Sequence, residues 1–355
     1  MRQVFICSNK EQYDEIISRI NDDIRCVCWN DLLQKAEQKI DQIVEDGDVL
    51  YIAADERQLE ALLKLGIRRD RICVYSFFRD TTFSNPMEGI FTQNSNGLIL
   101  GMSHAQCGID EKLLKNADYF KVASPSMDAF LHLKYYEKIS EDYPEETKQI
   151  KSIIIELPYY VFNYDLSRFG KFLYTKLNYF KIIGNFHHFG ETVEQKVIIR
   201  DFYRFLQIFK EQPKITVDSK KSNLLRCFAK KIINGYRIAT LHDKVWFSSY
   251  PKTIQENKKY LSDLIKLIKI HSPDAKISVL VMPFNPIFRK THIKVCNKWK
   301  ILFYTFFEEL NIKIIDTFNS VSSSLDFNDH CHLNSKGREK YSKHLATMLI
   351  EIEKD

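Results

Sequence analysis

The stretch from Asn96 to Gly108 reads NGLILGMSHAQCG and decides the fold of the chain. Its apolar run, Leu98–Leu100, breaks at Gly101, and Ser103 follows two residues later. An apolar run that ends in glycine and leads into a helix-compatible segment predicts a buried strand, a tight turn and a helix. A serine at such a turn lies at the carboxyl edge of a parallel sheet, beside the N–H groups of a helix start. We therefore expect the hydroxyl of Ser103 to be accessible at this edge.

Short apolar runs alternate with helix-like segments on both sides of this stretch. Helices are expected, among others, over residues 32–44, 56–65, 253–268 and 336–352. Such an alternation predicts parallel sheets covered by helices, that is, an α/β protein. The expected strands are residues 2–7, 24–29, 49–54 and 71–75 before the stretch, and 119–123, 152–156, 276–283 and 312–315 after it.

A chain of 355 residues is long for one core, so two domains are expected. Residues 1–80 predict a small Rossmann-like unit, but the glycine-rich phosphate turn is missing after the first strand, where CSNKEQ stands from Cys7. This unit should therefore bind no dinucleotide. Residues 81–355 form the second expected domain. Within it, residues 166–245 lack strand alternation and predict a helical insertion.

The charge and the cysteine content of the chain bear on its expected partners and location. The net charge of +6 is too mild to indicate a nucleic-acid partner. The basic residues between Lys210 and Arg237 predict a solvated face, with contact to an anionic glycan or peripheral contact to a membrane surface as the alternative. Eight scattered cysteines without a C-x-x-C pair indicate reduced thiols and a cytoplasmic location. We expect neither a signal peptide nor a transmembrane segment.

A second informative stretch, Asn328 to Gly337, reads NDHCHLNSKG. Asp329 and His332 are three residues apart in a turn before a helix, so the carboxylate can fold back onto its own histidine. A serine nucleophile needs a base, and an imidazole base needs an acceptor on its other nitrogen. A loop after a late strand and a serine after an early strand meet at one edge of a parallel sheet. The sequence thus predicts Ser103 as nucleophile, His332 as base and Asp329 as its orienting group, with Asn334 or Ser335 capping the next helix.

The pairing of Gly-Met-Ser103-His with Asp329-x-x-His332-Leu-Asn-x-x-Gly resembles the SGNH (GDSL-like) hydrolase superfamily. Within it, the chain is most similar to the bacterial polysaccharide O-acyltransferases related to alginate acetylation and teichoic acid D-alanylation. The resemblance covers roughly residues 97–350 in scattered blocks. It implies a three-layer α/β/α domain and serine-dependent acyl transfer on a carbohydrate, as an O-acetyltransferase or an esterase of surface polysaccharide biosynthesis. It implies no bound cofactor, with an acyl donor such as acetyl-CoA as a substrate.

The same resemblance implies where the oxyanion would be held. In the second sequence motif of the family, a glycine binds the oxyanion through its backbone N–H. Ser126 stands in the place of that glycine here and still has a backbone N–H. The Gly-x-Asn-Asp of the third family motif is absent, and Tyr159 and Asn163 are the available substitutes for oxyanion or substrate binding. Met102 stands where the family has an aspartate before the nucleophile.

Other interpretations of these residues stay open. Ser103 is compatible with a plain helix N-cap. His330, Cys331 and His332 are possible metal ligands with His104 or with residues 187–188, although adjacent His-Cys-His lacks the usual ligand spacing, and we expect no metal. A non-catalytic glycan-binding or scaffold protein on the same fold is the main rival function. A nucleotide-sugar enzyme working through residues 1–80 is the other, and the missing phosphate turn disfavours it.

Overall fold

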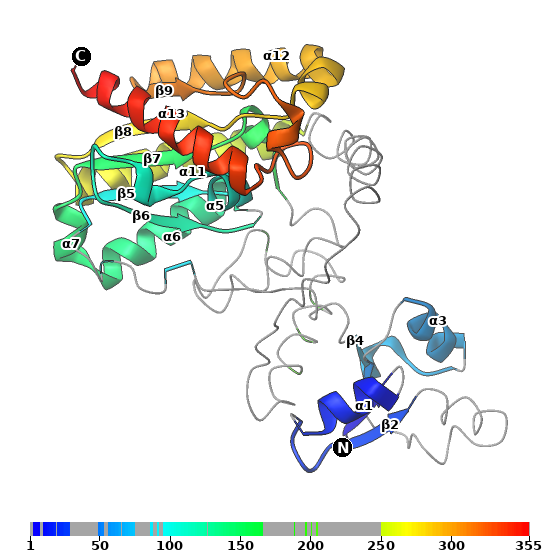
Figure 1. Cartoon of the computed structure of the whole chain (residues 1–355). Coiled ribbons are helices and arrows are strands. Elements are labelled where there is room, and N and C mark those ends of the chain that lie inside the picture. Colours follow the sequence, from blue (N-terminus) through cyan, green and yellow to red (C-terminus); the bar gives the residue numbers. More distant parts are fainter. Residues whose placement is uncertain are drawn as a thin grey trace. The chain divides into compact units, whose positions relative to one another are not determined.

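The computed structural model describes residues 3–28 apart from 8, 9 and 19, residues 49–74 apart from 53–55 and 65, residues 95–165 apart from 126, and residues 250–354. It also describes the single positions 86, 87, 91, 188, 196, 200 and 204. The helix expected at 32–44 lies outside the described residues, as does nearly all of the helical insertion expected at 166–245. The chain divides into two compact units, Met1–Phe83 with Ser167–Ser219, and Ser84–Leu166 with Lys220–Asp355 (Figure 1).

The described part of the first unit contains a parallel sheet with the strand order β2-β1-β3-β4. The four strands expected before residue 80 are confirmed. Helix α3 ends before Gly66, whose φ of +82° is the left-handed conformation that glycine adopts at low cost. The elements are β1 (Gln3–Cys7), α1 (Lys10–Ile17), β2 (Arg25–Cys28), β3 (Val49–Ile52), α3 (Glu56–Lys64), η1 (Arg69–Arg71) and β4 (Ile72–Val74).

The second unit is built on a five-stranded, wholly parallel sheet with the order β6-β5-β7-β8-β9. The chain starts in β5, moves outward to β6, and then crosses to β7 on the other side. The strand order therefore reverses between β5 and β7, and ligands of open α/β sheets bind at the carboxyl edge of such a point. The strands are β5 (Gly97–Gly101), β6 (Tyr119–Ala123), β7 (Ser152–Glu156), β8 (Lys276–Val281) and β9 (Lys313–Asp316).

Helices flank this sheet, so the α/β class expected from the sequence is confirmed. Figure 1 shows α13 in front of the sheet and α11 behind it. Among the described residues, no helix combines the length and the apolar character needed to cross a bilayer. The helical elements are α5 (Ser103–Gly108), η2 (Glu111–Leu113), α6 (Ala129–Asp142), α7 (Pro144–Lys148), η3 (Tyr159–Asn163), α11 (Pro251–His271), α12 (Pro286–Glu309), η5 (Ser324–Asp326) and α13 (Ser335–Lys354).

One core layer fixes α5 and α13 against the sheet. Buried residues on one side of the strands, such as Ile99 and Ile154, pack with Ala105 of α5 and with the apolar stripe of α13. Three members of that stripe are four residues apart and the fourth is three residues before the last, which places all of them on one side of the helix. The stripe of α13 is Tyr341, Leu345, Ala346 and Leu349.

Candidate active site

Ser103 stands at the point where β5 passes into α5. All five residues of β5 are buried, and Met102 is extended, with φ −89° and ψ −167°, before α5 begins at Ser103. Gly101 makes this turn possible, because a Cβ there would lie 2.5 Å from Cβ of Ala105 and 3.2 Å from a carboxyl oxygen of Glu156. The strand, turn and helix expected from the sequence are confirmed. The helix ends at Gly108, and a separate 3-10 turn, η2, carries Leu113.

Asp329 organises the loop that follows η5. Its Oδ1 accepts the backbone N–H groups of Cys331 at 2.9 Å and His332 at 2.8 Å. Its Oδ2 accepts the ring Nδ1–H of His332 at 2.7 Å. The three-residue spacing therefore does what the sequence predicts, since one carboxylate shapes the turn and orients the imidazole.

Neighbouring segments hold this loop in place. Asn285, just before α12, makes two of these contacts. Its backbone N–H donates to the carbonyl of His330 at 3.0 Å, and its side-chain Nδ2 donates to the carbonyl of Asp329 at 3.2 Å. The backbone N–H of Asn328 donates to the carbonyl of His332 at 2.7 Å. Asn334 accepts the N–H of Gly337 at 3.0 Å, so of the two expected helix caps it is Asn334 that caps α13.

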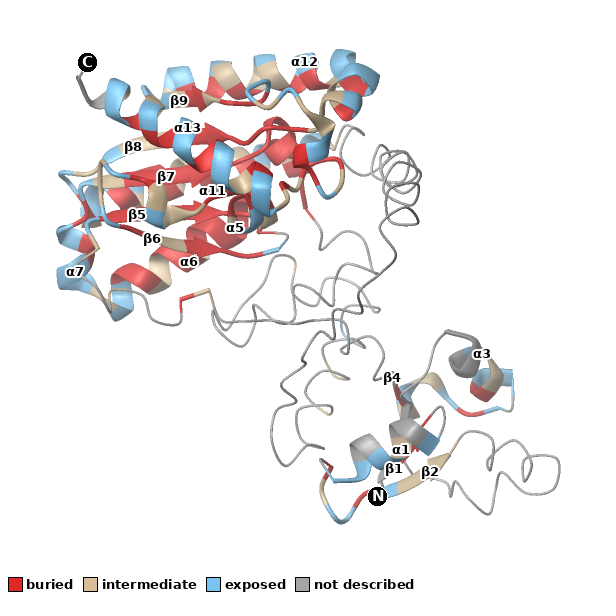
Figure 2. Cartoon of the chain, viewed as in Figure 1, coloured by how far each residue is buried: buried red, intermediate tan, exposed pale blue. Residues whose placement is uncertain are grey.

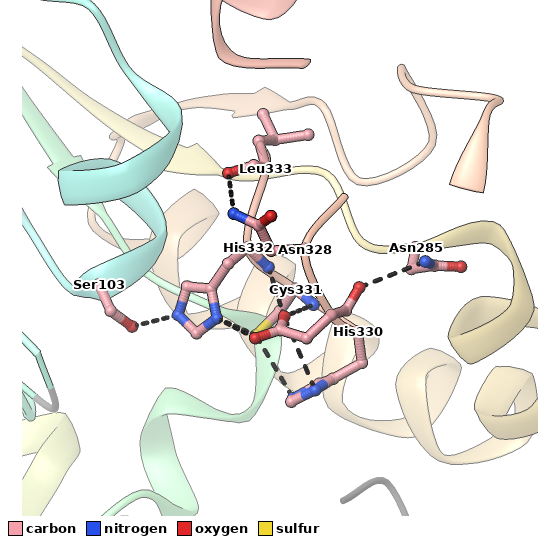
Figure 3. A network of polar contacts seen from close by, with 8 residues as sticks. Ser103, Asn285, Asn328, His330, Cys331, His332 and Leu333 are labelled. Atoms are coloured by element: carbon pink, nitrogen blue, oxygen red, sulfur yellow. Dashed lines mark hydrogen bonds and ion pairs between the residues drawn. The ribbon is translucent and has the colours of Figure 1, made fainter. Parts of the chain in front are cut away.

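The two remote segments meet at the imidazole of His332. Its Nε2 lies 2.8 Å from Oγ of Ser103, and Figure 3 shows the two side chains pointing toward each other. Because a carboxylate can only accept, Nδ1 of His332 carries the proton, and Nε2 is left to accept the Ser103 hydroxyl. The structure thus brings together Ser103, His332 and Asp329. All three are partly exposed, and the side chains of His332 and Asp329 are 26% and 31% accessible.

The electrostatics of Asp329 agree with this role. Burial disfavours its charged form. Three interactions favour the charged form and together outweigh burial. They are the hydrogen bond from His332, the charge of that imidazole and the N–H of Cys331. The pKa of Asp329 is therefore lowered from its ordinary value, and the carboxylate is charged whenever the site operates near neutral pH.

A buried carboxyl group that the sequence analysis missed lies behind Ser103. Glu156 closes β7 and is fully buried, and its Oε2 accepts the backbone N–H of Met102 at 2.7 Å. Its Oε1 accepts Nδ1–H of His104 at 3.1 Å. Glu156 therefore holds the residues on both sides of Ser103 across the point where the strand order reverses. The available signal was a glutamate at the end of the apolar strand Ser152–Glu156, since a buried carboxyl needs hydrogen-bond partners.

The residues expected to hold an oxyanion have other contacts. The hydroxyl of Tyr159 donates to Oδ2 of Asp316 at 2.7 Å, and burial, followed by that hydrogen bond, raises the pKa of Tyr159. The side-chain carbonyl of Asn163, which is 1% exposed, accepts the backbone N–H of Tyr250. These contacts fix η3 against β9 and the start of α11, so they do not support the expected oxyanion role of Tyr159 or Asn163. Ser126 lies outside the described residues.

A cluster of nitrogen and sulfur atoms surrounds the base. One ligand-type atom each from His104, Cys331 and His332 lies within 4.8 Å of the other two. Such atoms are typical zinc ligands. However, both ring nitrogens of His332 already bind Ser103 and Asp329, and burial, then the charge of Asp329, raises the pKa of the Cys331 thiol. A metal ion would have to break one of these contacts, so the geometry favours an imidazole base over a metal ligand.

Comparison with known proteins adds no relative. No protein-family model matches the chain, and a search of curated proteins finds no significant match. The residues of the site and their geometry are therefore the basis for inferring a function.

Proposed function

We propose that the second unit is a serine-dependent acyl-transfer enzyme that acts on a carbohydrate, with the SGNH-like arrangement that its motifs resemble. The observation that carries this proposal is the hydrogen-bonded chain from Ser103 through His332 to Asp329, at the carboxyl edge of the sheet where the strand order reverses. Its substrates would be an acyl donor such as acetyl-CoA or an ester, and a sugar of a bacterial surface polysaccharide handled on the cytoplasmic side.

The chemistry follows from the direction of the hydrogen bonds. Oγ of Ser103 attacks the acyl carbonyl while Nε2 of His332 takes its proton, and Asp329 stabilises the imidazolium that forms. The backbone N–H groups of Ser103 and Ser126 are the proposed oxyanion donors. Collapse of the tetrahedral intermediate expels the donor's thiol or alcohol, which takes the proton from His332. A sugar hydroxyl or water then attacks the acyl-enzyme, with His332 again as base. The bond to Oγ of Ser103 breaks, Oγ takes the proton back from His332, and the acylated sugar or the free acid leaves.

A non-catalytic glycan-binding protein is the second candidate. It is favoured by the contacts of Tyr159 and Asn163, which leave the oxyanion without the side-chain donors expected from the sequence. One missing donor costs about 3 kcal/mol of transition-state stabilisation.

Turnover of p-nitrophenyl acetate separates the two candidates. The enzyme proposal expects hydrolysis by the full chain and its loss in His332→Ala, whereas His344→Ala, an exposed histidine of α13, retains it. Equal rates in all three proteins, or no rate above buffer, would favour the glycan-binding protein.

A further inference from the structure

Helix α12 has an unusual charge pattern. From Pro286 to Phe307 it contains no acidic residue, and its only carboxylates are Glu308 and Glu309 at the end. The same segment carries five arginine and lysine side chains. These are Arg289, Lys290, Lys294, Lys298 and Lys300.

The helix has two distinct sides. Its inner side is apolar and buried, and includes Phe288, Cys296, Trp299 and Phe303. Figure 2 shows exposed positions recurring along its other side. We call this side the outer face of α12 and define it by five exposed residues. Ile287 and Lys290 precede the kink of the helix at His292 (φ −112°, ψ 16°), and Lys294, Lys298 and Ile301 follow it at spacings of four and three. The two isoleucines are 51% and 70% exposed.

In the part of this unit that the structure describes, several exposed lysines on other helices are paired, whereas the three on the outer face are not. Lys259, Lys266 and Lys343 each pair with a carboxylate on their own helix, at 3.2, 3.7 and 2.6 Å. Among the described residues, no acidic side chain pairs with the three lysines of the outer face. The two remaining cations of α12 are engaged elsewhere, since Lys300 pairs with Asp316 and Arg289 binds carbonyl groups such as that of Val321.

We propose that the outer face of α12 binds an anionic phospholipid surface. A basic face that also exposes large apolar residues is typical of helices that lie in the membrane interface. In this arrangement the three lysines contact headgroup phosphates, and Ile287 and Ile301 enter the headgroup region. A soluble polyanion would gain little from exposed isoleucines beside the lysines.

The outer face begins beside the candidate active site. The residue before α12, Asn285, bonds to the loop that carries Asp329 and His332, and the ring of Phe288 lies 5.4 Å from that of His330. Membrane binding would thus hold the site near the lipid surface, where a lipid-linked glycan is presented. Only this last step rests on the proposed function.

Vesicle co-sedimentation of the full chain tests the proposal. We expect binding to vesicles of phosphatidylcholine with phosphatidylglycerol, weaker binding at high salt, and little binding to phosphatidylcholine alone. Each lysine of the outer face should contribute about fivefold to the affinity, so Lys290→Gln, Lys294→Gln and Lys298→Gln together should weaken it about 100-fold. Ile301→Ser should weaken it without changing the net charge.

The matched control removes the same charge from paired lysines. Lys259→Gln, Lys266→Gln and Lys343→Gln together should bind vesicles like the wild type, with circular dichroism confirming that both triple variants are folded. Equal loss in both triple variants, or no loss in the first, would overturn the proposal. Binding to a single-stranded oligonucleotide but not to vesicles would assign the face to nucleic acid instead. Ser103→Ala should bind vesicles normally, so this test does not depend on catalysis.

Discussion

Oγ of Ser103 lies 2.8 Å from Nε2 of His332, although 229 residues separate them in the sequence. The contact exists because Ser103 follows β5 and His332 follows β9, and both strands end at the same edge of a parallel sheet. The lone pair of Nε2 faces the hydroxyl because Asp329 fixes the proton on Nδ1. This is the arrangement that a general base needs.

Asp329→Asn should reduce turnover of p-nitrophenyl acetate by about 10⁴-fold. The amide of asparagine can donate to Nδ1, which would move the imidazole proton to Nε2 and remove the acceptor for Ser103. The measurement is kcat for the wild type and the variant, with circular dichroism to verify folding. A variant that keeps turnover within about twofold would remove Asp329 from the mechanism.

The charge of Asp329 should also make the free energy of unfolding depend on pH in acid. Its folded-state pKa is below the ordinary value of 3.8, so its charge stabilises the fold above that pH. This stabilisation is lost as the pH falls through the folded-state pKa. Urea unfolding at several pH values should therefore show a difference between wild type and Asp329→Asn that is largest above pH 3.8 and shrinks below it. A difference that stays constant down to strong acid would contradict this.

Glu156→Gln should lower kcat by about tenfold and leave KM nearly unchanged, because glutamine keeps only one of the two acceptor oxygens and so alters the contact with His104. The glutamine carbonyl can still accept the N–H of Met102, so the fold should survive. Glu309→Gln, an exposed change at the end of α12, is the control and should have no effect. A change confined to KM, or no change, would mean that Glu156 does not position Ser103.

Tyr159→Phe should destabilise the fold by about 1 kcal/mol and leave turnover unaltered, because the lost hydroxyl binds Asp316. Urea unfolding and p-nitrophenyl acetate kinetics measure the two effects. A loss of about 100-fold or more in kcat with little change in stability would restore the oxyanion role that the sequence suggested.

The strands and the meeting of Ser103, His332 and Asp329 were predictable because local patterns encode them. Apolar runs bounded by turns mark the strands, and the spacing of Asp329 and His332 lets one turn orient its own imidazole. Glu156 was not predictable in the same way, since its contact with Met102 depends on the register of β7 against β5. The sequence also does not tell which way an aromatic residue of a 3-10 turn faces, and Tyr159 turns toward Asp316.

Covalent labelling by a fluorophosphonate, read by intact-protein and peptide mass spectrometry, is the sharpest test of Ser103 as a nucleophile activated by His332. We expect one adduct on Ser103 of the wild type, none on Ser103→Ala, and much slower labelling of His332→Ala. Equal labelling of the wild type and Ser103→Ala would contradict this role of Ser103.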